Sequence, residues 1–179
     1  MARAESIRRF AQAAFEVARE REGLDRWEQD LSEVQTLLAN EDFAALVDAP
    51  QAPLQVKLDG VKTLLRDVSP QVRNFVAVLI VKRRTRRFDD IFAEFRRLAD
   101  EQRGIARAQV VTAVPLDGGR RQKVSDALGQ IVEKQVVMTE RVDAAILGGI
   151  VARVGDKLID GSTRARLHEL RSTLAVRPA

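Results

Sequence analysis

The sequence contains no cysteine and a single histidine, His168, among its 179 residues. The lack of cysteine excludes disulfides, thiolate nucleophiles and cysteine-ligated metals, and it is consistent with a reducing compartment. One histidine is too few for a metal site or an acid–base pair built on imidazole groups. These absences argue against an enzyme, and we expect no catalytic residue, no bound metal and no cofactor.

Long hydrophobic runs are missing as well. The longest strongly apolar run, Val76 to Val81, is far shorter than the roughly 20 residues that cross a bilayer. The N-terminus is rich in arginine, as transit peptides are, but Glu5 and Glu16 break the pattern and no apolar core follows. We therefore expect the first helix of the mature protein here, and no insertion into a membrane.

Charge of one sign is not in large excess either. Lysine and arginine number 30 and aspartate and glutamate 26, which gives a formal net charge of +4. A dedicated nucleic-acid-binding protein usually concentrates far more positive charge on one face. Hydrophobic residues make up 45% and charged residues 31%, so the chain can bury a core and stay soluble, as one domain or two small ones.

Apolar residues recur at helical spacing up to about Gly104. Gly23 breaks the first helix, and Ser69-Pro70 supplies the N-cap and first-turn proline of the fifth. Short turns separate six such helices, which predicts a compact helical bundle. The helices are expected over residues 4–22, from Leu24, around Phe43 to Val47, from Leu54, from Ser69-Pro70 and from Phe88.

The pattern changes after Gly104, where β-branched residues begin to alternate. The sequence predicts, in order, a strand over 107–114, a helix over 119–135, strands over 136–142 and 150–154, and a helix from Ser162. This β-α-β-β-α order predicts a small sheet covered by two helices. We therefore expect a mainly α chain, with a six-helix domain over residues 1–104 and a small α/β domain over residues 105–179.

The basic run KRRTRR, Lys82 to Arg87, is the most visible charge feature. One interpretation is a patch that contacts the phosphates of RNA or DNA. The alternative, which we favour, is a solvated turn between the fifth and sixth helices, with cations placed favourably at a helix C-terminus. No aromatic residues alternate with the cations, and Asp89-Asp90 follow at once, so the run alone is weak evidence for nucleic-acid binding.

The segment over residues 147–167 holds four glycines and is the strongest candidate for a ligand site. It does not fit a phosphate loop of the Walker type, because Gly149 and Gly155 have the wrong spacing and aspartate, not lysine, follows the second. The dinucleotide fingerprint Gly-x-Gly-x-x-Gly is absent too. Each nucleotide-binding interpretation therefore fails on spacing.

Turn geometry explains the same residues better. Gly148-Gly149 can adopt positive φ or form a bulge between two strands. Gly155-Asp156 lies where the strand over 150–154 must reverse, and glycine in the first turn position suits a type II′ hairpin. Asp160-Gly161-Ser162 predicts an Asx-type turn that leads into a serine N-cap.

The aspartates of this segment leave one catalytic alternative. Asp143, Asp156 and Asp160 lack the dense alternating oxygen ligands of a calcium loop. A small hydrolase built on them would lose activity in Asp160→Asn. A role in turns predicts a loss of stability in the same variant.

The segment VDAAILGGIVARVGDKLIDGSTRARLHEL resembles the C-terminal signature of the delta subunit of F-type ATP synthases, a family that includes the mitochondrial oligomycin-sensitivity-conferring protein. In that family a valine-aspartate and a hydrophobic pair precede Gly-Gly, and a Gly-Asp turn and Asp-Gly-Ser follow. The matching positions are Val142-Asp143, Ile146-Leu147, Gly148-Gly149, Gly155-Asp156 and Asp160-Gly161-Ser162.

The resemblance extends over nearly the whole chain. FAQAAF, from Phe10 to Phe15, is similar to the family's Tyr-Ala-x-Ala-Leu/Phe box on the first helix, with phenylalanine where tyrosine is usual. The region Arg83 to Phe88 resembles the arginine-containing turn before the sixth helix, and ARAQVVTAVPL resembles the family's strand before the C-terminal domain. Because this box starts at Phe10, we expect a bacterial protein without an organelle presequence.

The resemblance implies a non-catalytic role in the peripheral stalk. The helical domain would hold the N-terminal segments of the alpha subunits on the catalytic head. The C-terminal part would contact the ends of the b subunits, so that the head cannot turn with the rotor. One copy would serve each complex, at the cytoplasmic face of the bacterial plasma membrane.

By analogy with the family, we expect an alpha-subunit helix to lie between the first and fifth helices. The expected contact residues are Phe10, Ala14, Phe75, Val76 and Leu79. The alternative is that these five side chains are internal core. A nucleic-acid-binding helical module that uses Lys82 to Arg87 is the second functional hypothesis.

Overall fold

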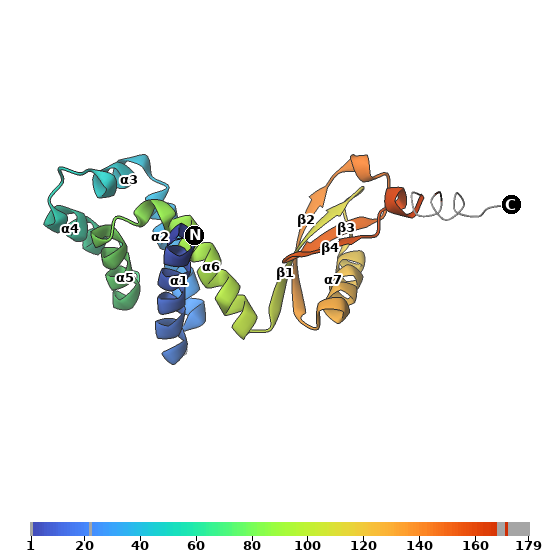
Figure 1. Ribbon diagram of the computed structural model, residues 1–179, viewed down its shortest axis with the longest axis horizontal. Helices are drawn as coiled ribbons and strands as arrows, with labels where there is room; N and C mark the ends of the chain where they lie inside the picture. Colours follow the sequence, from blue (N-terminus) through green and yellow to red (C-terminus); the bar gives the residue numbers. More distant parts are fainter. Residues whose placement is uncertain (1, 22, 168–170, 172–179) are drawn as a thin grey trace. The chain divides into compact units, whose positions relative to one another are not determined.

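The structure is a computed structural model that describes residues 2–21, 23–167 and 171. The chain divides into two compact units, residues 1–99 and residues 100–179 (Figure 1). Each unit has a hydrophobic core of its own. The sequence places the change of pattern near Gly104, and the last helix of the first unit continues to Gln102.

The N-terminal unit is helical, as the sequence predicts. A short 3₁₀ turn η1, Thr85–Arg87, joins its fifth and sixth helices. The helices are α1 (Ala2–Glu20), α2 (Leu24–Leu38), α3 (Glu41–Asp48), α4 (Leu54–Leu64), α5 (Pro70–Val81) and α6 (Phe88–Gln102). The mainly α fold class is therefore confirmed, and the predicted helix starts at Leu24, Leu54 and Phe88 coincide with the observed ones.

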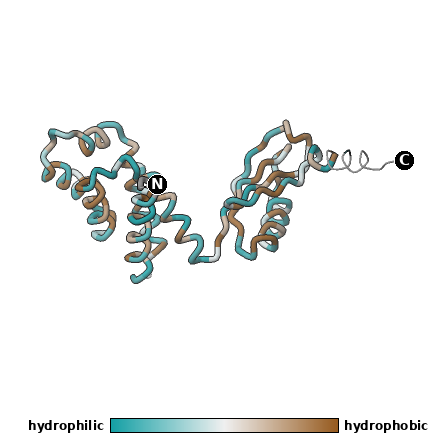
Figure 2. Tube along the Cα trace, viewed as in Figure 1, coloured by the Kyte–Doolittle hydropathy of each residue, from teal (hydrophilic) through white to brown (hydrophobic). Residues whose placement is uncertain are grey.

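The core of this unit forms from the apolar stripes that helical spacing predicts, which Figure 2 shows as hydrophobic colour recurring along each helix. Phe92 and Phe95 of α6 are fully buried among them. Trp27 of α2 stacks on Phe95, with ring centroids 6.2 Å apart, and also contacts Phe75 of α5. The contacts among these three aromatic rings therefore pack α2 against both α5 and α6.

The predicted N-cap of α5 is at the expected position, but it does not form the expected hydrogen bond. Ser69 occupies the N-cap position of α5 and Pro70 its first turn, as expected, but the serine hydroxyl makes no capping hydrogen bond. Instead the backbone N–H of Ser69 donates to Oδ2 of Asp30 on α2, over 3.0 Å. A side chain distant in sequence therefore holds this helix start, which local sequence patterns do not reveal.

The C-terminal unit is a four-stranded sheet in the order β2-β1-β3-β4. Strands β1 and β2 are parallel and α7 connects them, whereas β1–β3 and β3–β4 are antiparallel. The elements are β1 (Ile105–Thr112), α7 (Gly118–Val132), β2 (Gln135–Val142), the 3₁₀ turn η2 (Ala144–Ile146), β3 (Ile150–Val154) and β4 (Lys157–Asp160). The small α/β fold is confirmed, but the sequence prediction missed β4.

Helix α7 covers one face of the sheet (Figure 1). Alternate residues of the strands point toward it and form the second core: Ala108, Val110, Val136, Ala152 and Val154, with Leu128 of α7. The predicted last helix begins as expected, since residues 163–167 are helical. The single histidine, His168, lies outside the described residues.

Candidate functional site

The five residues expected to line the groove divide into two groups in the structure. Ala14, Val76 and Leu79 are buried in the core of the N-terminal unit. Phe10 of α1 and Phe75 of α5 are only partly buried and pack against that core. Of the five, only the two phenylalanines reach the surface, whereas the other three form the layer beneath.

Two exposed stripes extend from these phenylalanines along their helices. On α1, Ala13 follows Phe10 by three residues and Val17 follows Ala13 by four, and Val17 is 39% exposed. On α5, Val78 follows Phe75 by three residues and is 46% exposed. Residues at such spacings share one face of a helix, so each helix presents a narrow apolar stripe. These five side chains are the ones that we assign to the expected groove between the two helices, and we refer to them as the α1–α5 groove.

The sequence prediction did not include Ala13, Val17 and Val78, which the structure places at the surface beside the two phenylalanines' helical faces. The signal was present, because each lies three or four residues from Phe10, Ala13 or Phe75 on the same helical face. Helical spacing alone, however, does not tell an exposed apolar stripe from a buried one. The buried faces of α1 and α5 carry equally regular patterns.

A surface cavity of about 560 Å³ lies where α1 approaches the residues that follow α5. Phe10 forms part of its wall. The other lining residues are mostly polar or charged: Glu5, Ser6, Arg9 and Ala13 from α1, with Lys82 and Arg84 from the turn after α5. Phe10 and Ala13 therefore belong both to the α1–α5 groove and to this basic cavity, whose lining includes three cations and one carboxylate.

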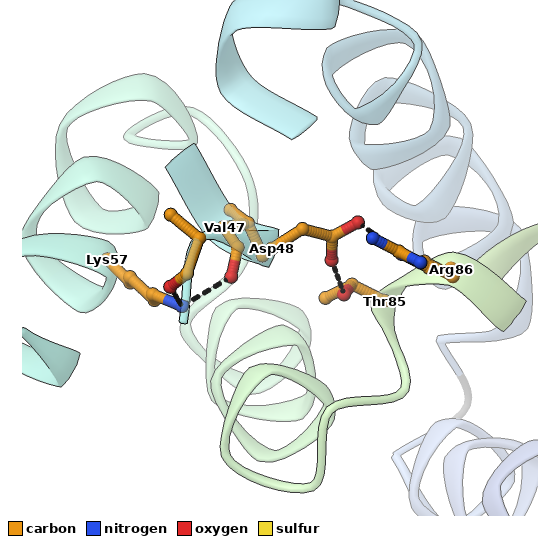
Figure 3. A network of polar contacts seen from close by, with 6 residues as sticks. Val47, Asp48, Lys57, Thr85 and Arg86 are labelled. Carbon is orange, nitrogen blue, oxygen red and sulfur yellow. Dashed lines mark hydrogen bonds and ion pairs between the residues drawn. The ribbon is translucent and has the colours of Figure 1, made fainter. Parts of the chain in front are cut away.

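The basic run forms the turn between α5 and α6, in agreement with the favoured interpretation. Its second half is fixed in the fold around Asp48 (Figure 3). Thr85 Oγ1 donates to Asp48 Oδ1 over 3.0 Å, and Arg86 Nε donates to Asp48 Oδ2 over 2.7 Å. The hydrogen bond to Asp48 raises the pKa of Arg86 above its ordinary value. Arg87 pairs with Asp90 over 3.4 Å.

The same network closes the end of α3. Lys57 Nζ donates to the carbonyl oxygens of Val47 and Ala49, each over 2.7 Å (Figure 3). These carbonyls lie at the C-terminal end of α3, where backbone acceptors lack partners within the helix. Lys57 thus satisfies that helix end, and Asp48 joins it to η1.

The first half of the basic run has a different character. Lys82, Arg83 and Arg84 are exposed and form no ion pair within the described residues. Arg83 adopts a left-handed backbone, with φ of 53°. The N–H groups of Arg83 and Arg84 donate to the carbonyls of Ile80 and Leu79, which is the Schellman arrangement that usually places glycine at this position.

The glycine-rich segment folds as turn chemistry predicts. Gly149 has φ of +78°, and a Cβ atom placed on it would lie 2.3 Å from the carbonyl oxygen of Gly161. The segments around Gly149 and Gly161 are held together by two backbone hydrogen bonds. Gly161 N donates to Ile150 O over 2.8 Å, and Thr163 N donates to Gly148 O over 3.0 Å. The predicted positive φ at Gly148-Gly149 is confirmed, with a close approach of two backbones as its cause.

The β3–β4 hairpin is the turn expected at Gly155-Asp156. Val154 pairs with Lys157, so the turn has two residues. Gly155 has φ of +57°, and Asp156 is not among the described non-glycine residues with positive φ. Positive φ at the first position alone is the pattern of a type II′ turn.

Two of the three aspartates considered above, Asp143 and Asp160, accept hydrogen bonds from the backbone. Asp160 Oδ1 accepts from Ser162 N over 2.9 Å, and Ser162 Oγ accepts from Ala165 N over 3.2 Å, which confirms the Asx-type turn and the serine N-cap. Asp143 accepts from Ala145 N. Hydrogen bonds from the hydroxyl and the backbone N–H of Ser162 lower the pKa of Asp160, and those from the backbone N–H of Ala145 and from Arg141 lower the pKa of Asp143. Nowhere in the described part of the chain do three acidic or histidine side chains group to bind a metal ion.

Within residues 2–21 and 23–167, none of the helices has the length and apolar character needed to span a membrane. A protein-family model described as "ATP synthase delta (OSCP) subunit" matches residues 7–174. The chain is 35% identical to ATP synthase subunit delta of Desulforamulus reducens over 176 residues, which cover 97% of each chain. It is 37% identical to the protein of that name from Brevibacillus brevis over 162 residues, 89% of this chain and 93% of the relative.

A solved structure shares the fold. The structure of the Toxoplasma gondii mitochondrial ATP synthase hexamer contains a chain that matches this one with a TM-score of 0.70. The match covers 96% of this chain and 98% of that chain, at 23% sequence identity.

Proposed function

Because the chain belongs to the ATP synthase delta (OSCP) family, a family of non-catalytic peripheral-stalk subunits, we propose that it links the catalytic head to the b subunits and resists rotor torque. The N-terminal unit holds the N-terminal helices of the alpha subunits. The C-terminal unit contacts the ends of the b subunits. One copy serves each proton-translocating complex, at the cytoplasmic face of a bacterial plasma membrane.

The observation that carries this proposal is the α1–α5 groove. Phe10, Ala13 and Val17 on one helix and Phe75 and Val78 on the other present apolar surface at helical spacing. An amphipathic helix binds such a surface through anchors one turn apart. The buried side chains of Ala14, Val76 and Leu79 belong to the core beneath this surface, which supports a binding surface that is ordered before the partner arrives.

A preformed groove suits a stator. A subunit that resists torque must dissociate slowly, and rigid apolar contacts lower the rate of dissociation more than they raise the rate of association. Nothing in this role requires a titrating group, a metal or a cofactor. The aspartates of the glycine-rich segment fit the same description, because they hold turns.

The sheet face opposite α7 is the surface that we assign to the b subunits. Alternation along the strands places Val137 of β2 and Leu158 of β4 on this face, and they are 43% and 62% exposed. These two exposed apolar side chains, one on each edge strand of the sheet, support the assignment.

The experiment is co-purification of the full chain with the catalytic head, before and after removal of the alpha N-terminal segments. We expect the trimmed head to bind at least about 100-fold more weakly, as loss of a central apolar anchor does. Undiminished binding to the trimmed head contradicts the groove assignment.

Matched variants separate the groove from general surface effects. Val78→Asp places a charge in the groove, and Leu64→Asp places the same charge on α4, where the side chain is 55% exposed. Only the first should weaken binding to the head. For the b subunits, Leu158→Asp should weaken binding, and Ile131→Asp on α7, a site 54% exposed, should not.

A further inference from the structure

The basic cavity at one end of the α1–α5 groove contains charges that the fold does not use. Arg9, Lys82 and Arg84 line it, and Glu5 is the one carboxylate in its wall. None of the three cations forms an ion pair within residues 2–21 and 23–167. Three cations therefore surround the space next to Phe10 without an internal partner.

Other cations of the same unit behave differently. Arg26 pairs with Asp30 over 2.9 Å, Arg86 with Asp48 over 2.7 Å, and Arg96 with Glu28 over 3.3 Å. The unit thus pairs cations where they serve its own stability. The cavity instead gathers three cations that have no such partner within the described residues.

Backbone geometry places two of these cations. The Schellman arrangement after α5 fixes Lys82 and Arg84 through hydrogen bonds to the last carbonyls of that helix. It does so with arginine in the left-handed position, where glycine is favoured. The backbone from which the two side chains extend is therefore fixed, which reduces the entropy lost when they bind a complementary charge.

The groove is also polarised along its length. The stripe on α5 changes from the apolar Phe75 and Val78 to Lys82 within two turns. The stripe on α1 ends in the apolar Val17, away from Arg9. Positive charge is therefore concentrated at one end of an otherwise apolar surface.

We propose that the amphipathic helix bound in the α1–α5 groove carries a carboxylate that lies against Arg9, Lys82 and Arg84, and that this contact fixes the direction of the bound helix. The inference rests on the proposed function and adds to it the chemistry of the partner. The acidic side chain lies within one turn of the apolar side chain that packs on Phe10. Arginine binds a carboxylate with two parallel hydrogen bonds, so the contact orients the helix as well as attracting it.

The first test measures affinity. The probe is a synthetic peptide of the alpha-subunit N-terminal segment from the same organism, titrated into the full chain at about 50 mM and about 500 mM salt. Lys82→Glu with Arg84→Glu should weaken binding at least about tenfold at low salt, and the difference should shrink at high salt. The control, Lys123→Glu with Lys134→Glu, makes the same charge change at exposed sites in the C-terminal unit and should stay within about twofold.

The second test measures direction. Because the chain has no cysteine, Arg8→Cys and Glu20→Cys each give one spin-label site, near either end of α1. The label at position 8 should broaden the NMR signals of the acidic end of the peptide, and the label at position 20 those of the other end. Charge reversal at Lys82 and Arg84 should remove this preference.

The outcomes separate the two proposals. If the unmodified chain does not bind the peptide, both are wrong. If it binds, and charge reversal changes neither affinity beyond about twofold nor the broadening pattern, only the orienting carboxylate is wrong. Replacement of each acidic residue of the peptide by its amide, one at a time, should identify a single position whose loss reproduces the effect of charge reversal.

Discussion

At the scale of single residues, Asp30 has a structural role that the sequence does not reveal. Its side chain is fully buried on α2 and accepts the backbone N–H of Ser69 at the start of α5. Arg26 lies 2.9 Å from its other oxygen, within ion-pair distance but without hydrogen-bond geometry. Asp30 therefore links α2 to the start of α5, through a residue 39 positions away in sequence.

We expect Asp30→Ala to lower the free energy of unfolding of the N-terminal unit by about 2 kcal/mol, because a buried N–H loses its acceptor. Urea unfolding followed by Trp27 fluorescence measures this, since the only tryptophan reports on that unit. Asp67→Ala, at an exposed site nearby, is the control. An equal effect of the two substitutions would contradict the role of Asp30.

Arg83 gives a second prediction at this scale. Its left-handed backbone, with φ of 53°, suits glycine better than arginine. Arg83→Gly should therefore stabilise the N-terminal unit by about 0.5–1 kcal/mol in the same unfolding experiment. A loss of stability would show that the arginine side chain makes a contribution that outweighs the backbone strain.

Local sequence patterns correctly predicted those hydrogen bonds whose donor and acceptor are close in sequence. The Asp160–Ser162 turn and the serine N-cap follow from side chains that bond within three residues. The cap at Ser69 did not follow, because its acceptor comes from another helix. The exposure of a side chain is equally hard to predict from the sequence. Helical spacing places Phe10 on one face of its helix, but only the packing of the helices shows that this face reaches the surface.

At the scale of elements, the glycine-rich segment determines whether the end of the sheet can form. Gly149→Ala would place a methyl group 2.3 Å from the carbonyl oxygen of Gly161, on a backbone with positive φ. We expect a loss of about 3 kcal/mol in the stability of the C-terminal unit. Thermal unfolding by circular dichroism measures it, with Gly118→Ala as control, because a Cβ there has no neighbour within 4 Å. Similar melting of the two variants would refute the close approach.

Glu140 joins three elements and makes the C-terminal unit sensitive to acid. It accepts from the backbone N–H of Leu116 over 2.7 Å, from Arg121 of α7 over 2.7 Å and from Thr112 of β1 over 3.2 Å. The hydrogen bond from Leu116, followed by that from Arg121, lowers the pKa of Glu140 below its ordinary value of 4.5.

A lowered pKa in the folded state means that the ionised carboxylate stabilises the fold above pH 4.5, and that this contribution disappears as pH falls through the folded-state pKa. Glu140→Gln should therefore be less stable than the unmodified chain at neutral pH and equal to it in stronger acid. Amide hydrogen exchange in β1 and β2 across this range measures the difference. A gap between the two proteins that does not change with pH would contradict this assignment.

Periodicity predicted the long elements and missed the shortest one. Helix α5 carries apolar residues at regular helical spacing over its whole length, so its start could be placed at Ser69-Pro70. Strand β4 has four residues, Lys157–Asp160, with a charge at each end. Such a segment becomes a strand because the hairpin at Gly155 brings it beside β3.

At the scale of the whole molecule, the balance between apolar and charged contacts decides how the chain responds to salt. Binding to the catalytic head should weaken by no more than about tenfold between about 50 and about 500 mM salt, because the groove is mainly apolar. Binding through phosphate contacts would weaken far more steeply. A filter-binding titration with duplex RNA is the parallel measurement. Tight, salt-sensitive RNA binding would revive the nucleic-acid hypothesis.

The position of β1 within its sheet has a mechanical consequence. The chain enters the C-terminal unit through this strand, which is hydrogen-bonded to β2 on one side and to β3 on the other. Its pairing with β2 extends over all residues from Ile105 to Thr112. A pull along the strand loads these backbone hydrogen bonds together in shear, rather than opening them one after another. Tension on the chain therefore reaches this unit at the strand best able to withstand it.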